Sequence, residues 1–230
     1  MKKLLLLLVS ILISFNSYGE TKSYYYSNGQ IESEINYKDG KEDGKTTYWD
    51  ENGRKWKEEN YKDGKRDGKT TYWDKNSQIK EVENYKDGKR DGKWTEWYEN
   101  GQIKEVENYK DGDQDGKWIV WYKNGQKWIE GNFKDFEWHG KRTEWYENGQ
   151  IQSEGNYNTD GKLDGKSILW YKNGQKWIEV NYKDGDHDGK RTEWYESGQI
   201  SSEENYKDGN PDGKMTYWST SGQISSETTY

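Results

Sequence analysis

The sequence contains no cysteine among its 230 residues. Disulfide bonds are therefore excluded, and so is attachment to lipid through a lipobox cysteine. Apolar residues are also scarce, because 28% of the chain is hydrophobic and 34% is charged, a balance that excludes a thick aliphatic core. The chain does contain 14 Trp and 20 Tyr, and aromatic side chains supply most of the burial available to a small core. The composition predicts a thin structure with an aromatic spine.

The N-terminal segment differs from the rest of the chain. "MKKLLLLLVSILISFNSYG" has two lysines, an apolar run from Leu4 to Phe15 and then small residues. This is the layout of a secretory signal peptide, so we expect cleavage after Gly19. The alternative is an uncleaved anchor, for which the apolar run is short. We expect an exported protein located in the periplasm, at the cell surface or in the medium.

Charge excludes one class of partner. Removal of the two N-terminal lysines leaves 34 of the 36 basic residues against 43 acidic ones, which is a net charge of −9. Binding to nucleic acid requires clustered basic residues, so no nucleic-acid partner is expected.

A repeat accounts for the rest of the sequence. An Asn-Gly or Ser-Gly step recurs every 24 residues, with one interval of 25, and an Asp-Gly step before Lys recurs with it. Such periods indicate stacked supersecondary units, and they predict nine repeats over residues 20–230. The glycines of the first step are Gly29, Gly53, Gly101, Gly125, Gly149, Gly174, Gly198 and Gly222, with Ser77 once in their place. Those of the second are Gly44, Gly68, Gly92, Gly116, Gly165, Gly189 and Gly213, with "HG" at Gly140.

Each repeat is predicted to be a β-hairpin. "YENGQ" lies between stretches rich in aromatic and β-branched residues, and Asn-Gly accepts the positive φ angles of a type I′ turn. The second connection, "YKDGKRDGK", contains two Asp-Gly steps and predicts a wider loop. No segment has a helical period. The sequence therefore predicts an all-β fold, an extended single-layer twisted antiparallel meander of stacked hairpins, with about eighteen strands over about 85 Å.

A two-residue turn fixes the residues that face each other across a hairpin. Several predicted partners are apolar together, which supports the register because cross-strand pairs stabilise sheets. The predicted pairs are Tyr98–Ile103, Trp97–Lys104, Glu96–Glu105, Val120–Ile129, Leu169–Ile178, Trp121–Trp128 and Trp170–Trp177.

Two aromatic columns run through the repeats, and strand alternation predicts that they lie on opposite faces. One column stands four residues before the turn glycine, at Tyr25, Trp49, Trp73, Trp97, Trp121, Trp145, Trp170, Trp194 and Trp218. The other stands eight residues after it, at Tyr37, Tyr61, Tyr85, Tyr109, Phe133, Tyr157, Tyr182, Tyr206 and Tyr230.

The "W-Y-x-N-G-Q" turn, the "N-Y-K-D-G" strand end and the "x-D-G-K" return resemble MORN-type repeats, in their bacterial variant of about 24 residues. The resemblance extends from Tyr24 to Tyr230. It implies an extended sheet of hairpins that serves as an adaptor or membrane-association module, and an antitoxin-like role in some members. The chain departs from the pattern at Ser77, at an inserted residue in "NYNTDG" and at Phe136, which replaces a glycine.

Catalytic and metal-binding residues are poorly represented. The two histidines, His139 and His187, stand where other repeats have Asp, and we expect both to be solvated loop residues. The loops "DGDQDG" at Asp111 and "DGDHDG" at Asp184 match half of a calcium-binding loop, but the ligand expected at the twelfth position is missing. We favour turns at both loops and leave calcium binding open. No enzyme activity and no cofactor are expected.

The predicted binding residues, or alternatively the structural spine, are tryptophans. On a flat sheet, exposed aromatic rings could stack on sugar rings or lipid head groups. The leading interpretation is an exported scaffold for a protein partner. The alternatives are a carbohydrate- or cell-wall-binding protein, or an antitoxin- or immunity-type binding protein, and a membrane surface also stays open as a partner. The candidate residues are Trp94, Trp97, Trp118, Trp121, Trp128, Trp170 and Trp177.

Overall fold

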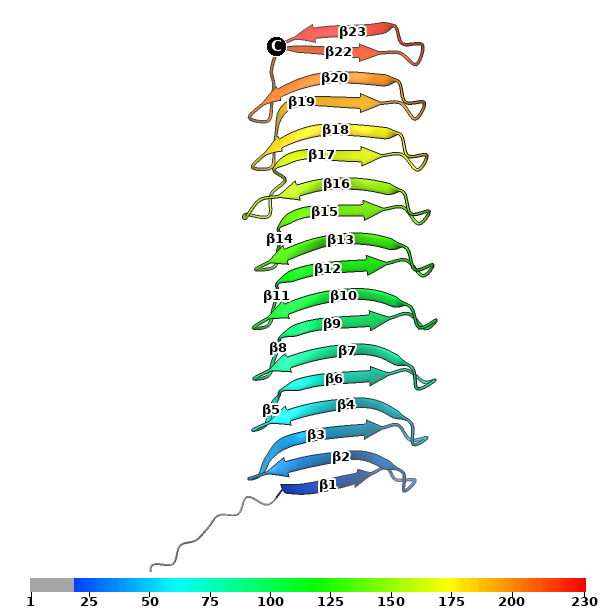
Figure 1. Ribbon diagram of the computed structural model, residues 1–230, viewed down its shortest axis with the longest axis vertical. Coiled ribbons are helices and arrows are strands. Elements are labelled where there is room, and N and C mark those ends of the chain that lie inside the picture. The colour runs from blue at the N-terminus through cyan, green and yellow to red at the C-terminus, as the bar shows by residue number, and fades with distance from the viewer. Residues whose placement is uncertain (1–18) are drawn as a thin grey trace, which may run out of the picture.

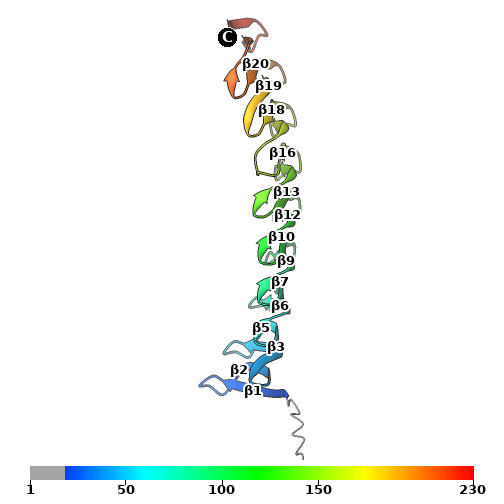
Figure 2. The same ribbon diagram turned by 90° about the vertical axis from the view of Figure 1, so that its left-hand side faces the viewer.

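The computed structural model describes residues 19–230, so all of the predicted signal peptide except Gly19 lies outside the described residues. The described part is one open antiparallel sheet of 23 strands. Hairpins follow one another in chain order along the long axis (Figure 1), and the edge-on view shows a single narrow layer (Figure 2). The predicted all-β, single-layer meander of stacked hairpins is confirmed. Residues 19–230 include no helix suited to crossing a membrane.

Eighteen strands form nine hairpins, as the turn pattern predicts. They are β1 (Gly19–Tyr25) with β2 (Ile31–Lys38), β3 (Lys41–Trp49) with β4 (Lys55–Lys62), β6 (Gly68–Trp73) with β7 (Ile79–Lys86), β9 (Gly92–Trp97) with β10 (Ile103–Lys110), β12 (Gly116–Trp121) with β13 (Lys127–Lys134), β15 (Gly140–Trp145) with β16 (Ile151–Tyr157), β17 (Gly165–Trp170) with β18 (Lys176–Lys183), β19 (Asp186–Trp194) with β20 (Ile200–Lys207), and β22 (Lys214–Trp218) with β23 (Ile224–Thr229). Five two-residue strands lie in the returns: β5 (Lys65–Arg66), β8 (Lys89–Arg90), β11 (Asp113–Gln114), β14 (Glu137–Trp138) and β21 (Asn210–Pro211).

The Asn-Gly turns are wider than predicted. In the β9–β10 hairpin, the Gly101 N–H donates to the Tyr98 carbonyl and the Tyr98 N–H donates to the Gln102 carbonyl, each at 2.9 Å. Gly101 has a φ of +81°, whereas Asn100 is not among the residues with positive φ. This is a type I turn followed by a glycine bulge. The predicted type I′ turn is wrong, because the Asn100 carboxamide accepts the Gln102 N–H at 3.1 Å and stabilises the other form. Ser77 takes the glycine conformation, with a φ of +62°.

The wider turn shifts the pairing beside it. Trp97 pairs with Ile103 and Glu96 with Glu105, which leaves Lys104 as the extra residue of a bulge. The pairs predicted farther from the turn, Glu96–Glu105, Val120–Ile129 and Leu169–Ile178, are confirmed. The pairs predicted next to the turn, Tyr98–Ile103, Trp97–Lys104, Trp121–Trp128 and Trp170–Trp177, are wrong by one residue, and Trp121 and Trp170 pair with Lys127 and Lys176.

The return connections hold the tight turns. Lys38 pairs with Lys41 around Asp39–Gly40, and these two loop residues have φ angles of +51° and +78°. Two consecutive positive φ values define the type I′ turn, so the tight and wide connections are the reverse of the prediction. Phe136 keeps this conformation with a φ of +68°, which is strained for a bulky residue.

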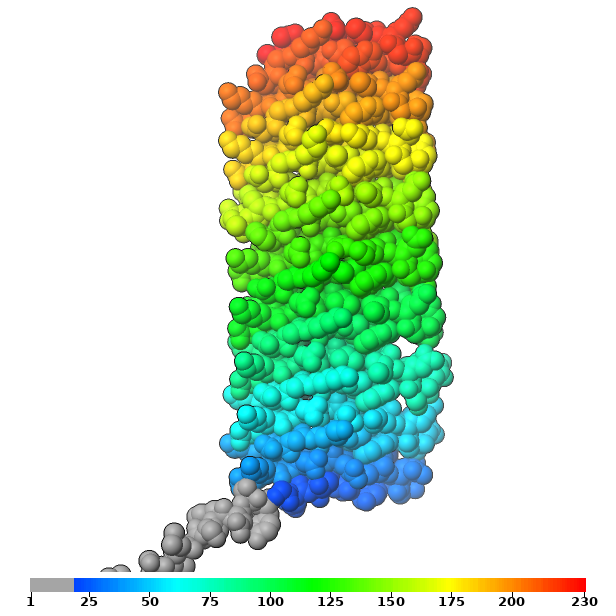
Figure 3. Space-filling view, viewed as in Figure 1, coloured from blue at the N-terminus to red at the C-terminus, as the bar shows by residue number. Residues whose placement is uncertain are grey.

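Little of this thin sheet is fully buried, and much of what is buried is polar. The buried apolar residues are Val106, Val120, Ile129, Val180 and Met215. The most deeply buried large side chains are instead those of Glu59, Thr46 and Thr70. In the space-filling view each repeat forms one band across the molecule, and neighbouring bands touch (Figure 3). Burial therefore arises between side chains of adjacent repeats on the same face.

Candidate functional site

One face of the sheet carries the second aromatic column, and we call it the tyrosine face, defined by Tyr61, Tyr85, Tyr109, Phe133, Tyr157, Tyr182 and Tyr206. In the early repeats this face has a polar interior. The Glu59 carboxylate forms ion pairs with Arg66 and Lys57, each at 2.8 Å. It also accepts a hydrogen bond from the Tyr61 hydroxyl at 3.2 Å. Glu83 is 2% exposed and pairs in the same way with Arg90. These carboxylates neutralise cations that would otherwise stand alone in a half-buried layer.

In the middle repeats the same face is aromatic. The rings of Trp118 and Trp138 lie 5.2 Å apart, and Phe133 stacks on Trp138 at 4.2 Å. Gly131 stands where the early repeats have the buried glutamate, and a Cβ at this position would lie 2.5 Å from the Trp138 ring. The absence of a side chain at Gly131 is therefore what admits the indole of Trp138.

Two tryptophans of the tyrosine face bind carboxylates through their indole N–H groups. Trp94 donates to Glu81 at 2.7 Å, and Trp118 donates to Glu105 at 2.5 Å. Burial raises the pKa of the Glu105 carboxyl above its ordinary value, although the Trp118 bond opposes this effect. The N–H groups of these two indoles are therefore already bonded within the sheet.

The opposite face carries the first column, and we call it the tryptophan face, defined by Trp49, Trp73, Trp97, Trp121, Trp145, Trp170, Trp194 and Trp218. Its tryptophans alternate along the sheet with the Ile or Lys residue that follows each turn, since Trp97 pairs with Ile103 and Trp121 with Lys127. The ammonium group of Lys127 lies 5.6 Å from the Trp145 ring of the next repeat. Ile103 is 38% exposed. The result is a continuous, half-exposed stripe of Trp with Ile or Lys.

The edge of the sheet formed by the Asn-Gly turns is called the turn edge. The extra residue of the bulge beside the turn is tryptophan in three hairpins, at Trp56, Trp128 and Trp177. Trp128 stacks on Tyr122 with ring centroids 5.6 Å apart, and Trp177 packs on Tyr171 at 5.7 Å. They are 43% and 41% exposed, respectively. Both indoles of this pair are therefore partly exposed to solvent.

The seven tryptophans named from the sequence therefore do not form one surface. Trp94 and Trp118 belong to the tyrosine face, where they bind Glu81 and Glu105. Those at the turn edge are Trp128 and Trp177, and those on the tryptophan face are Trp97, Trp121 and Trp170.

Hydrogen bonds between consecutive turns were not anticipated from the sequence. The tyrosine three residues before the turn glycine donates its hydroxyl to the carbonyl of the next repeat's tryptophan, as Tyr98 does to Trp121 at 2.6 Å. The turn asparagine adds a second bond, from Asn100 to the Lys123 carbonyl at 3.2 Å. The signal was the recurrence of tyrosine at this position in six repeats.

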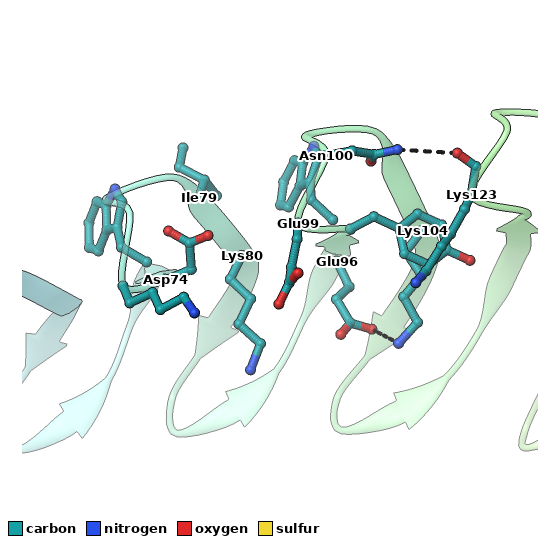
Figure 4. Close-up of a pocket in the computed structure, with 12 residues that line it drawn as sticks. Asp74, Ile79, Lys80, Glu96, Glu99, Asn100, Lys104 and Lys123 are labelled. Carbon is teal, nitrogen blue, oxygen red and sulfur yellow. Dashed lines mark hydrogen bonds and ion pairs between the residues drawn. The ribbon is translucent and has the colours of Figure 1, made fainter.

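We call this series of hydrogen bonds between consecutive turns the ladder. A cleft interrupts the ladder at the turn edge. It has a volume of about 760 Å³ and lies between the turn at Asp74 and the turn at Tyr98. Trp73, Ile79 and Trp97 provide its apolar walls. Figure 4 shows Asp74, Glu99 and Lys80 around the opening, with the Glu96–Lys104 ion pair of 2.7 Å beside it. The space-filling surface is notched at this edge, on the right of Figure 3.

The histidines and the aspartate loops do not form a recognisable reaction centre. The expectation of solvated histidines is wrong for His187, which lies in β19 with its ring between Tyr182 at 4.9 Å and Tyr206 at 5.0 Å. His139 is half-buried. Asp111 and Asp184 take the φ of +51° required by their tight turns. Across residues 19–230, His, Asp and Glu side chains form no group of three or more suited to a metal ion.

Comparison with known proteins identifies the repeat. The model of the MORN repeat variant family matches residues 21–39, 42–63, 66–87, 90–111, 114–135, 138–159, 163–184, 188–208 and 211–230. No curated protein matches the chain. Solved structures titled "Crystal Structure of TcdB2-TccC3" and "Crystal Structure of TcdB2-TccC3-Cdc42" align with 87% and 92% of this chain, at 9% and 11% identity and TM-scores of 0.25 and 0.24. The chain spans 13% of the length of each, and TM-scores this low do not establish a shared fold or function.

Proposed function

The chain belongs to the MORN repeat variant family, and from this premise we propose that it is an exported, non-enzymatic scaffold whose sheet binds a protein partner. Repeat arrays present long surfaces assembled from many copies of one unit. Tryptophan is also the residue type most enriched among the side chains that dominate binding energy at interfaces.

The observation that carries this proposal is the stripe on the tryptophan face. Its isoleucines are unusually exposed for their type, at 43% for Ile79, 38% for Ile103 and 37% for Ile200. A contiguous apolar stripe with charged residues interspersed is typical of a protein-binding surface. The lysines that replace isoleucine in other repeats, such as Lys127, keep the stripe from being uniformly apolar.

The chain supplies its own substitutions for a test. Lysine occupies the Ile103 position in three repeats, at Lys55, Lys127 and Lys176, so the double variant Ile103→Lys/Ile200→Lys should fold. Biotinylated protein would be used to capture partners from envelope and host-surface fractions, half of them protease-treated and half periodate-treated. We expect protease-sensitive capture by the native chain and at least a tenfold loss in this variant.

The matched control adds the same charge away from the stripe. Gln152→Lys/Ser201→Lys changes bulge positions where Lys104 and Lys80 stand in other repeats. This control variant should capture the same amount of partner as the native chain. Equal capture by both double variants would exclude the stripe as the binding surface. Sequencing the N-terminus of the protein from cell fractions tests export separately, and a chain beginning at Glu20 is expected.

A glycan-binding function is the second candidate, and the exposed rings of Trp128 and Trp177 at the turn edge favour it. A sugar ring stacks on an exposed aromatic face. Lysine stands at the equivalent positions Lys80 and Lys104, so Trp128→Lys/Trp177→Lys should preserve the fold. Periodate-sensitive capture that this variant loses would establish the glycan function in place of the protein scaffold.

An immunity-type role is a special case of the protein scaffold, in which the partner is a toxin. Deletion of the gene should then impair growth only when the toxin is present. Unchanged growth beside every neighbouring toxin would exclude this version.

A further inference from the structure

Consecutive turns along the turn edge are separated by eight gaps, and six of them are filled by a tyrosine ring. In each, the phenol hydroxyl donates to the carbonyl of the next repeat's tryptophan, at 2.6 to 2.9 Å. The tyrosines are Tyr26, Tyr98, Tyr122, Tyr146, Tyr171 and Tyr195. The gap therefore has a defined ligand chemistry, a flat apolar ring that ends in one hydrogen-bond donor.

Two gaps have an aspartate in place of the tyrosine, and they differ from each other. At the first, Asp50 holds Arg54 in an ion pair of 2.8 Å, and Arg54 reaches across to the Lys75 carbonyl at 3.2 Å. Arg54 therefore bridges this gap. At the second, Asp74 accepts only the backbone N–H groups of its own turn, from Asn76 and Gln78.

The gap beside Asp74 is the cleft described above. Within residues 19–230, no side chain donates a hydrogen bond across it to the Trp97 carbonyl, which is the equivalent of the carbonyls bound by tyrosine elsewhere. Asn76 likewise makes no bond to the next turn of the kind that Asn100 makes to Lys123. The tyrosine and asparagine links are both missing here, as they are at Asp50, but within the described residues no side chain replaces them as Arg54 does there. A space of about 760 Å³ opens to the edge instead.

The surroundings of this gap match those of the filled ones. Glu99 overhangs it (Figure 4), and the equivalent glutamates Glu51, Glu147 and Glu196 accompany Tyr26, Tyr122 and Tyr171. The apolar walls at Trp73 and Trp97 belong to the column that flanks every gap. Glu99 is therefore compatible with a phenol ring beside it, and the walls that flank the ring in the filled gaps are present here.

We propose that the cleft beside Asp74 receives a tyrosine side chain of the protein partner, whose ring packs against Trp73 and Trp97 and whose hydroxyl donates to the Trp97 carbonyl. The inference rests on the proposed scaffold function and names the side chain that the scaffold recognises. The protein partner thus supplies the seventh tyrosine of the ladder.

The first test measures the cleft with a simple probe. N-acetyl-tyrosine amide is titrated into the purified chain while the indole N–H signals are followed by NMR. Saturable shifts at Trp73 and Trp97 are expected. N-acetyl-phenylalanine amide should bind roughly threefold to tenfold more weakly, because it cannot form the hydrogen bond to the carbonyl.

Two variants make the result specific. Asp74→Tyr places the chain's own tyrosine in the gap, so it should raise the melting temperature and abolish the shifts. Tyr98→Ala empties a filled gap and should create a second probe site, reported by Trp121. Absence of saturable shifts in the native chain, or their persistence in Asp74→Tyr, would overturn the inference.

A capture experiment distinguishes failure of this inference from failure of the proposed scaffold function. If the native chain captures a partner, Asp74→Tyr should reduce capture at least tenfold, and mutation of a single partner tyrosine to Phe should weaken binding. Capture that Asp74→Tyr leaves intact would overturn the inference while the scaffold function stands. Probe binding without any protein capture would instead refute the scaffold function, and with it the assignment of a protein ligand.

Discussion

The early repeats, β3 to β10, and the middle repeats, β12 to β18, have the same strand pairing within their hairpins but different interiors. In the early region Glu83 is buried against Arg90. Seven residues separate that pair, and the same spacing in the middle region gives Gly131 under Trp138. The pairing registers of the two regions are equivalent. Backbone hydrogen bonds and turns therefore define this sheet. The buried layer of its tyrosine face accommodates either an ion pair or an indole that packs over a glycine.

Each interior depends on a matched pair of residues seven positions apart. A fully buried carboxylate such as Glu83 requires the cation, because an unpaired buried charge is costly, whereas the half-buried Glu107 accepts a hydrogen bond from Gln114 instead. An indole in the interior requires the glycine, because any Cβ would overlap the ring. Both positions differ between the Glu83–Arg90 pair and the Gly131–Trp138 pair, which makes each region a control for the other.

The largest loss of stability is expected when the glutamate of the early region is placed in the middle region without its arginine. Gly131→Glu places a side chain 2.5 Å from the Trp138 ring at its Cβ and leaves the carboxylate without its arginine. We expect the free energy of unfolding in urea to fall by about 4 kcal/mol. The double variant Gly131→Glu/Trp138→Arg rebuilds the early pair and should recover more than half of this loss. Additive losses in the double variant would contradict the pairing.

Removing the cation in the early region should cost less. Arg90→Ala leaves Glu83 unpaired at 2% exposure. Because the arginine itself is partly exposed, we expect a loss of about 2 kcal/mol, below the range for a fully buried pair. Glu83→Gln/Arg90→Ala removes the charge as well and should lose less in the same urea titration. Equal losses in the two variants would show that packing, and not charge, is responsible.

Alkaline pH should weaken the early region through its tyrosines. Burial, together with the Glu107 carboxylate, raises the pKa of Tyr109 from 10.0 to about 12. A raised pKa stabilises the fold fully below pH 10, and this contribution is lost between pH 10 and pH 12 as the unfolded chain ionises first. Since Tyr109 is partly exposed, we expect less than about 1 kcal/mol from this residue.

Phenylalanine occupies the position of Tyr109 in the middle region, at Phe133. Tyr109→Phe should therefore fold and should lose less stability than the native chain between pH 9 and pH 11.5. Identical pH dependence in the two proteins would rule out the contribution of Tyr109.

The smallest effect concerns the tryptophan face, where the two regions should behave alike. Hydrogen bonds from Lys166 and Lys176 lower the pKa of Glu179. At Glu58, burial opposes this effect, but the hydrogen bonds from Lys45 and Lys55 still leave the pKa lowered. A lowered pKa stabilises the fold above the unfolded value of about 4.3, and this is lost as the pH falls through the folded pKa.

Lys166→Met and Lys45→Met should each cost about 0.5 kcal/mol at pH 7. Both costs should shrink at pH 3, where the glutamates are protonated. A cost in one region more than twice that in the other, measured by urea titration, would mean that the regional difference extends through the sheet to this face.

The repeat unit, the eighteen hairpin strands and the inner pairs were predictable because glycine spacing and cross-strand pairing are local in the sequence, whereas the five two-residue strands of the returns were not predicted. The turn types were not, since Asn100–Gly101 and Asp39–Gly40 both satisfy the preference for type I′. What separates them is the bond from the Asn100 side chain to the Gln102 N–H, which depends on the folded turn. The first connection also acquires a bulge, and the neighbouring pairs shift with it.

The candidate site was predictable in composition but not in arrangement. The tryptophan column was evident from its period, and strand alternation places Trp94 and Trp97 of β9 on opposite faces. The position of Trp128 at the edge depends instead on the bulge beside the turn. The cleft was missed because it arises from something that one repeat lacks. Asp74 is visible in the sequence as a departure from tyrosine, but its meaning depends on the bond that Tyr98 makes to Trp121.

Strand pairing in chain order also determines how the molecule responds to a mechanical load. Tension applied between β1 and β23 acts along the inter-strand hydrogen bonds, so hairpins peel away singly from an end. A released repeat of 24 residues extends to roughly 80 Å, whereas in the sheet its two strands occupied about 10 Å. Each released repeat therefore lengthens the molecule by about 70 Å, and the rest of the sheet remains folded.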